Sequence, residues 1–143
     1  MSWYSKSIRQ KMPNVFQGIF FHGSIKENIS QFEVSNEQKF PVRGKGIFFS
    51  DSLKYASKFG NFIYVCEVIL NNPKIYNTSV DFEIDIMKNK NDIDFLYETL
   101  KSKNFDGIVI LKSRVSIGII KEVICFYDNK IKIIEKKILG KNL

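Results

Sequence analysis

Histidine and cysteine are scarce in this sequence. Its 143 residues include one histidine, His22, and two cysteines, Cys66 and Cys125. Each cysteine lies inside an apolar run, IYVCEVIL or EVICFY, where a small buried thiol is the usual role. These residues are too few for a zinc site or a disulfide framework. We therefore expect no bound metal, two reduced thiols and a cytoplasmic protein.

Long apolar stretches and linker-like segments are also missing. No apolar run reaches the roughly 20 residues that a membrane-spanning helix needs. The opening segment, MSWYSKSIRQKMPN, carries charge where a signal peptide has its apolar region. Repeats and low-complexity tracts are absent. The sequence predicts a single domain over residues 1–143 without a membrane segment, in the cytoplasm of the cell that makes it or of a host.

Positive charge, in contrast, is abundant. The chain carries a formal charge of +7, which attracts polyanions such as nucleic acid, anionic lipid or acidic proteins. The lysines are spread along the chain and become dense only in its last segment, KIKIIEKKILGKNL. This spread is typical of a solvated basic surface, which we favour over a nucleic-acid-binding role.

Short apolar runs rich in β-forming residues recur along the chain and are bounded by Gly, Asn, Asp or Pro. Six of them predict strands, over residues 15–23, 45–50, 62–70, 105–111, 122–127 and 130–134. Asp128-Asn129 predicts a turn that closes a final hairpin. Several short strands with two or three short helices indicate an α+β fold.

Capping residues indicate the helices. Ser50-Asp51-Ser52 precedes LKYASKF and predicts a short helix directly after a strand. Asp92 can cap a second helix that ends before Asn104, with Ile93, Leu96 and Leu100 on one face. Residues 80–89 fit neither a helix nor a strand clearly.

Three motifs follow one another in a fixed order. FFHGS contains His22, Gly23 and Ser24; GKGIFFSDSLKYASKF follows; and KEVICFYDNKIKII, which contains Glu122, comes after DGIVI. From about residue 16 to 134 these segments resemble the ADP-ribosyltransferase superfamily. The relevant branch includes poly(ADP-ribose) polymerases, diphtheria-toxin-like enzymes and short transferase domains of phage and mobile elements. One position departs from the family pattern, because Phe48 replaces the tyrosine of the second motif and lacks its hydroxyl.

The resemblance implies a fold and an activity. The fold is a split β-sandwich of two small antiparallel sheets with a cleft for NAD⁺ between them and a few short helices. The activity is transfer of one ADP-ribose unit from NAD⁺ to a macromolecule, a protein more than a nucleic acid. Such small domains often act as toxins or effectors. The acceptor, the organism and the oligomeric state are not indicated.

Glu122 is the expected catalytic residue. Cleavage of the nicotinamide glycosidic bond places positive charge on the ribose, and a carboxylate at the mouth of the cleft stabilises that charge. The alternative is structural: an edge-strand glutamate paired with a neighbouring lysine such as Lys121.

The resemblance assigns NAD⁺ binding to several other residues. His22 positions a ribose hydroxyl, and its alternative is a satisfied structural histidine. Gly23 offers main-chain groups to the carboxamide, since it has no side chain in the way, or else it is an ordinary strand-end turn. Phe48 and Phe59 form the walls of the nicotinamide slot, with Tyr55 as an alternative to Phe59 and a buried core as the alternative for all three. The remaining assignments are Ser24 beside Gly23, and Arg43 with Lys45 at the pyrophosphate.

The alternative function has the same fold but catalyses no reaction. It is a catalytically silent module that binds NAD⁺, nucleic acid or a partner protein, and Phe48 favours it while Glu122 opposes it. An RNA 2′-phosphotransferase of the same superfamily needs several arginines, and the chain has only Arg9, Arg43 and Arg114. GKG lacks the spacing of a nucleotide triphosphatase P-loop.

Overall fold

A computed structural model describes residues 15–34 and 45–140 of the chain. The strands are β1 (Phe16–Ser24), β2 (Ile47–Ser50), β3 (Phe62–Leu70), β4 (Pro73–Thr78), β5 (Gly107–Val115), β6 (Gly118–Cys125) and β7 (Ile131–Ile138). The helices are α2 (Leu53–Ala56), α3 (Ser79–Lys88) and α4 (Ile93–Ser102), with 3₁₀ turns η3 (Ser57–Phe59) and η4 (Asp128–Lys130). The α+β prediction is confirmed, and β4 is a strand that the apolar pattern missed.

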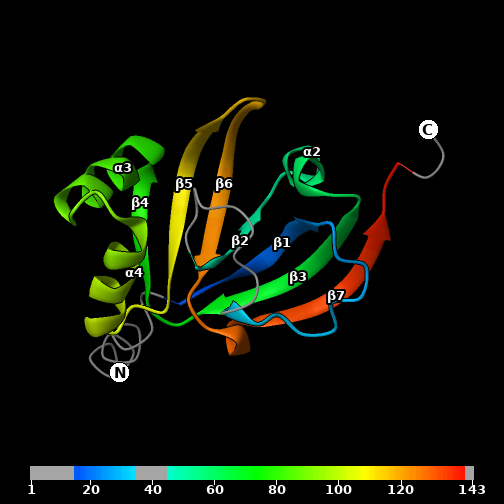
Figure 1. Ribbon diagram of the computed structural model, residues 1–143, viewed down its shortest axis with the longest axis horizontal. Coiled ribbons are helices and arrows are strands. Elements are labelled where there is room, and N and C mark those ends of the chain that lie inside the picture. Colours follow the sequence, from blue (N-terminus) through cyan, green and yellow to red (C-terminus); the bar gives the residue numbers. More distant parts are fainter. Residues whose placement is uncertain (1–14, 35–44, 141–143) are drawn as a thin grey trace, which may run out of the picture.

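The seven strands form one sheet, in the order β4-β5-β6-β2-β1-β3-β7 (Figure 1). Only β4 and β5 are parallel; the other neighbours are antiparallel. The described residues thus form one sheet, where the resemblance implies two. A single register pair, Phe21 with Ser50, joins the half made of β4, β5, β6 and β2 to the half made of β1, β3 and β7.

Side chains alternate between two cores on opposite faces of the sheet. Phe49 belongs to a core that crosses both halves and is covered by residues 25–34, where the Tyr64 hydroxyl donates to the Lys26 carbonyl at 2.7 Å. Phe48, its neighbour on β2, belongs to the other core, which α3 and α4 cover. Strand alternation places the two phenylalanines on different faces, and both are buried because each face is covered.

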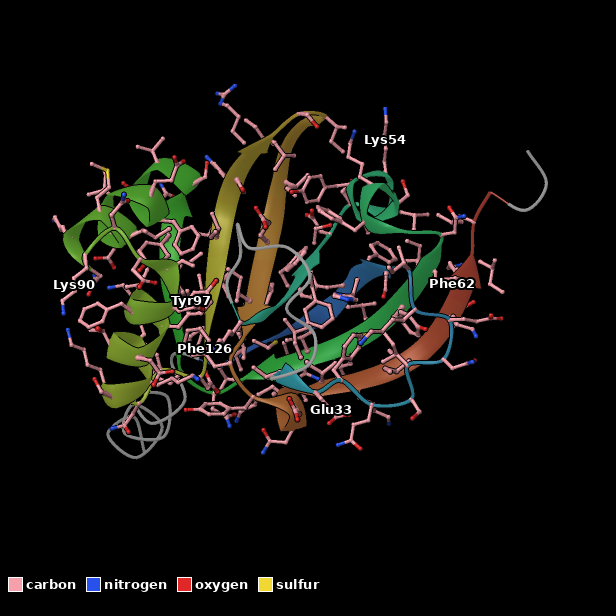
Figure 2. The ribbon with its side chains drawn as sticks, viewed as in Figure 1. Glu33, Lys54, Phe62, Lys90, Tyr97 and Phe126 are labelled. Atoms are coloured by element: carbon pink, nitrogen blue, oxygen red, sulfur yellow. The ribbon has the colours of Figure 1, made fainter. Side chains whose placement is uncertain are left out.

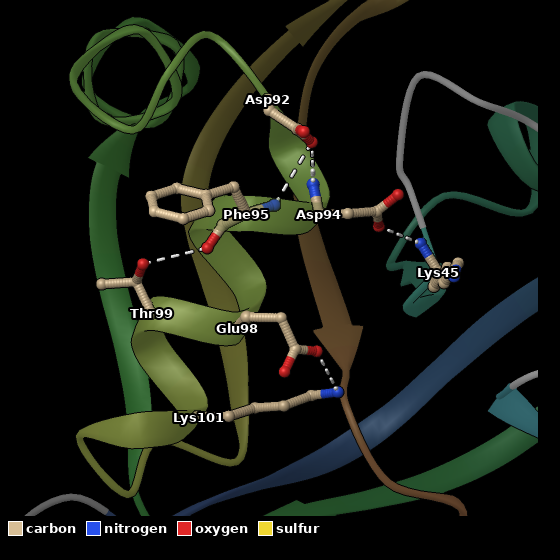
Figure 3. A network of polar contacts seen from close by, with 7 residues as sticks. All are labelled: Lys45, Asp92, Asp94, Phe95, Glu98, Thr99 and Lys101. Carbon is tan, nitrogen blue, oxygen red and sulfur yellow. Dashed lines mark hydrogen bonds and ion pairs between the residues drawn. The ribbon is translucent and has the colours of Figure 1, made fainter.

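The helices begin where the capping residues predict. The Ser52 hydroxyl accepts from the Tyr55 amide at the start of α2. A carboxylate oxygen of Asp92 accepts from the amides of Asp94 and Phe95 at the start of α4 (Figure 3). The segment whose sequence pattern was ambiguous is α3, capped by the Thr78 hydroxyl.

The predicted final hairpin is wrong. β7 pairs with β3, not with β6. β6 already has β5 on one edge and β2 on the other, so the chain turns at η4 and adds β7 to the open edge of β3. The hairpin of this region is instead β5–β6, which turns between Val115 and Gly118.

Both cysteines are buried and free, as the sequence predicts. Burial raises the pKa of the Cys66 thiol to about 12, and burial with the nearby Asp106 carboxylate raises that of Cys125. Within the two described ranges, no helix is long and apolar enough to cross a bilayer.

Candidate functional site

The three sequence motifs meet on adjacent strands at the centre of the sheet. β1 carries the first motif, β2 with α2 carries the second, and β6 carries the third (Figure 1). Ser50 at the end of β2 pairs with Phe21 on one side and with Glu122 on the other. The fold thus brings together segments that lie up to a hundred residues apart.

An aromatic cavity lies where β1, β2 and α2 meet. Its lining residues are Phe21, Gly23, Phe48, Phe49, Ser50, Tyr55, Ala56 and Phe59. The ring of Phe59 packs edge-on against those of Phe48 and Tyr55, with centroids 5.3 Å and 5.1 Å apart. The cavity has a volume of about 10 Å³, room for about one water molecule. Four of the predicted NAD⁺-binding residues therefore line one narrow slot.

Gly23 has a packing reason to be glycine. A Cβ atom at this position would lie 1.8 Å from the Ala56 carbonyl oxygen, a main-chain atom of α2. The helix therefore rests directly on the strand, and the space that a side chain would fill belongs to the helix. Gly23 lies inside β1, opposite Ile63 of β3, so the alternative of an ordinary strand-end turn does not describe it.

His22 and Ser24 lie on β1 on either side of Gly23, and both are buried. His22 Nδ1 lies 2.8 Å from the Phe48 carbonyl oxygen. A carbonyl only accepts, so Nδ1 carries the proton and the imidazole is fixed to β2. The Ser24 hydroxyl accepts from the Lys26 amide at 3.0 Å and closes a local turn.

Glu122 is fully buried on an interior strand. The Ser113 hydroxyl of β5 donates to its Oε1 at 2.5 Å. This contradicts the alternative of an edge-strand glutamate paired with Lys121. The main-chain amide of Lys121 instead donates to an Asp51 carboxylate oxygen at 3.0 Å. The expected place at the cleft mouth is corrected too, since no part of Glu122 reaches the surface.

Register places Glu122 on the face of the sheet that carries the aromatic slot. Glu122 of β6 is opposite Ser50 of β2, and Phe48 lies two residues before Ser50 on β2. All three side chains therefore share one face of the sheet. The sequence missed Ser113 as a partner of Glu122. It lies at an irregularity of the β5–β6 register, and no motif marks it.

The remaining assignments fall elsewhere. Arg43 lies outside the described residues. The Lys45 amide donates to Asp94 of α4 at 2.9 Å, which fixes the chain just before β2 (Figure 3). No group of three or more His, Cys, Asp or Glu side chains in residues 15–34 and 45–140 is arranged to hold a metal ion.

A larger groove than the aromatic slot is lined partly by other residues of the motifs, among them Lys45 and Phe126. A groove of about 650 Å³ runs between α4 and the end of β6 and includes Tyr97 and Phe126, whose ring centroids are 5.0 Å apart (Figure 2). Glu122, His22, Gly23, Ser24, Phe48, Tyr55 and Phe59 do not line it. Of the predicted site residues, Lys45 lines this groove, whereas Gly23, Phe48, Tyr55 and Phe59 line the aromatic slot.

Comparisons with known proteins give little. No protein-family model and no curated protein matches the chain. Among solved structures, one described as the crystal structure of an anti-CRISPR protein is similar over 85% of this chain and 95% of that chain, with 15% identity and a TM-score of 0.47. A likeness this distant carries no argument about activity.

Proposed function

We propose that this protein is an NAD⁺-dependent mono-ADP-ribosyltransferase whose catalytic residue is Glu122. The observation that carries the proposal is a fully buried carboxylate on the same sheet face as an aromatic slot, opposite a slot-lining residue. Burying an ionisable group is costly, and such groups are concentrated at functional sites. The packing of an ordinary core does not require a glutamate there.

In this proposal NAD⁺ lies across the strands that carry the motifs. The rings of Phe48 and Phe59 stack on the nicotinamide, whose positive charge an aromatic face attracts by roughly 0.5–2 kcal/mol. That attraction ends when neutral nicotinamide leaves. Gly23 presents main-chain groups to the carboxamide. His22 packs against Phe32 and Phe49 on the other face of the sheet and binds the Phe48 carbonyl, so its part in this proposal is to hold β2, and with it Phe48, beside β1.

Glu122 then acts on the ribose. Its carboxylate accepts a hydrogen bond from the 2′-hydroxyl and stabilises the positive charge that develops as the bond between C1′ and the nicotinamide nitrogen breaks. A nucleophile of the acceptor forms the new bond to C1′ and loses a proton. Ser113 keeps Oε1 in place through its 2.5 Å hydrogen bond.

The proposal extends to the fold and the acceptor. The two halves of the sheet, joined at one residue pair, correspond to the two sheets of a split sandwich, and the cleft lies where they part. The acceptor is a macromolecule, a protein in preference to a nucleic acid, and a toxin or effector role in the cytoplasm suits a small domain of this kind.

A second candidate function is supported by the small volume of the slot. A volume of about 10 Å³ does not admit nicotinamide, so catalysis requires α2 or the phenylalanine side chains to move outward. Without that motion the chain is a silent member of the same fold that binds a partner. Phe48, which lacks the hydroxyl of the family tyrosine, agrees with this alternative.

Nicotinamide release separates the two functions. We expect the wild-type protein to release nicotinamide from NAD⁺ in the presence of cell lysate, and Glu122→Gln, which keeps the size and a hydrogen-bonding group, to lower the rate about 100-fold or more. Glu135→Gln on the exposed strand β7 is the matched control and should leave the rate unchanged. No release by a folded wild-type protein, or equal rates for both variants, would contradict the transferase.

A further inference from the structure

The two edges of the sheet are protected differently. An edge strand presents unpaired main-chain groups that can pair with another chain, and charged side chains, lysine above all, usually prevent this. β7, at one edge, carries Lys132, Lys136 and Lys137 in eight residues. β4, at the other, has Pro73 at its start and one lysine, Lys74, and Ile75 at its middle is about half exposed, at 49%. In the described parts of the chain no strand pairs with the outer edge of β4.

A groove follows this unprotected edge. It has a volume of about 370 Å³ and lies between β4 and α3, the outermost elements on this side of the molecule (Figure 1). Ile75 of the strand and Ile84 of the helix both line it. Each wall of the groove therefore carries one exposed isoleucine among polar and charged side chains. The groove runs along the strand edge, where a further strand could be added.

The exposed side of α3 continues the apolar surface. Val80, Ile84 and Met87 recur at the spacing of one helical face and are 60%, 44% and 68% exposed. Phe82 and Ile86 of the same helix pack into the core instead. α3 thus has two apolar faces, and one of them has no cover among the described residues.

The charged residues along the groove indicate which partner binds there. Two acids, Asp81 and Asp85, and two lysines, Lys74 and Lys88, line it, so its charge is balanced although the whole chain carries +7. A strongly acidic or strongly basic partner would need a groove with a net charge of the opposite sign, which this groove lacks. Asp81 lies in the first turn of α3 and Lys88 in the last, so a two-fold axis that sets the two α3 helices antiparallel places Asp81 of one copy near Lys88 of the other.

We infer that β4 and α3 form the interface of a homodimer, in which β4 pairs antiparallel with β4 of a second copy. A two-fold axis perpendicular to the sheet joins the two sheets edge to edge. It also keeps both α3 helices on the same face, side by side across the junction, so their exposed apolar faces meet. The same two-fold axis covers both the open edge of β4 and the exposed apolar face of α3. This inference does not depend on the proposed enzymatic function.

Sedimentation of the full chain over a range of concentrations tests this. We expect a monomer–dimer equilibrium whose dissociation constant rises at least tenfold in Ile75→Lys and in Ile84→Lys. Ile134→Lys on β7 adds the same charge at a position of similar exposure, 54%, and should change the constant less than twofold. Circular dichroism verifies that each variant is folded. If a lysine variant does not fold, the smaller change Ile84→Ser is measured in its place.

Hydrogen exchange locates the contact. Amides of residues 74–78 should become protected as concentration rises, whereas those of β7 should not. A monomer at all concentrations up to the sub-millimolar range would overturn the inference. So would equal dissociation constants for Ile75→Lys and Ile134→Lys, or concentration-dependent protection on β7. Protection of residues 74–78 in a strictly monomeric protein by an added extended peptide would replace the second copy with a peptide ligand.

Discussion

At the scale of single residues, the pair formed by Glu122 and Ser113 is the most informative. A fully buried glutamate needs donors, and Ser113 supplies one from the neighbouring strand. The pair therefore has two consequences: it keeps a buried polar group satisfied, and it fixes the orientation of the proposed catalytic oxygen. Removing the hydroxyl affects both.

We predict that Ser113→Ala lowers the free energy of unfolding by about 1–3 kcal/mol, because a buried acceptor loses its donor. It should also slow nicotinamide release less than Glu122→Gln does, since the carboxylate itself remains. Ser113→Thr, which keeps the hydroxyl, should restore the rate. Urea denaturation and the release assay measure the two effects.

The control for this variant is Ser116→Ala, an exposed position in the turn of the same hairpin. Unfolding energies that are equal for the Ser113→Ala and Ser116→Ala proteins would show that the hydrogen bond to Glu122 contributes nothing.

At the scale of elements, the helices follow their caps closely. α4 begins after Asp92 because its carboxylate accepts from two amides that have no partner within the helix. The helix also fixes the start of β2, since Asp94 accepts from the Lys45 amide (Figure 3). A cap that the sequence already indicates thus helps to position the strand of the second motif.

We predict that Asp92→Ala lowers the free energy of unfolding by about 1 kcal/mol, the usual cost of losing an N-cap. Glu98→Ala removes an exposed ion pair with Lys101 in the same helix and should cost much less. Urea midpoints compare the two. A larger loss for Glu98→Ala would mean that the surface pair, not the cap, stabilises α4.

At the scale of the whole molecule, one core unites the two halves of the sheet. Cys66 on β3 and Cys125 on β6 lie in different halves but belong to the same buried cluster, together with Phe20 and Phe49. Unfolding of either half would therefore expose buried side chains of the other half to water. The single sheet and the shared core both favour a cooperative unit.

We predict that the two thiols become reactive at the same urea concentration. Native Cys66 should react roughly a thousandfold more slowly at pH 8 than an exposed thiol of pKa 9.0, because burial raises its pKa to about 12. For the same reason the free energy of unfolding should decrease as pH rises from 9 toward 12, since the folded state keeps a proton that the unfolded state loses.

Pulsed thiol labelling with peptide mapping gives a midpoint for each cysteine. Two well-separated midpoints would mean that the halves unfold independently, as two separate sheets would.

The sequence by itself determined six of the seven described strands and two of the three α-helices. Local rules sufficed for these: short apolar runs for the six strands, capping side chains for α2 and α4, and apolar surroundings for the two thiols. The order of the motifs also placed His22, Phe48 and Glu122 on three strands that proved to be neighbours. These features depend on residues close together in the chain.

Only the tertiary structure decided which edges pair and how tightly the site closes. β7 joined β3 because β6 had no free edge, and Gly23 is glycine because the Ala56 carbonyl occupies the space of its Cβ. β4, Ser113 and the narrow slot were likewise invisible in the sequence. Each depends on atoms brought together from distant segments, and local propensity carries no information about such distances.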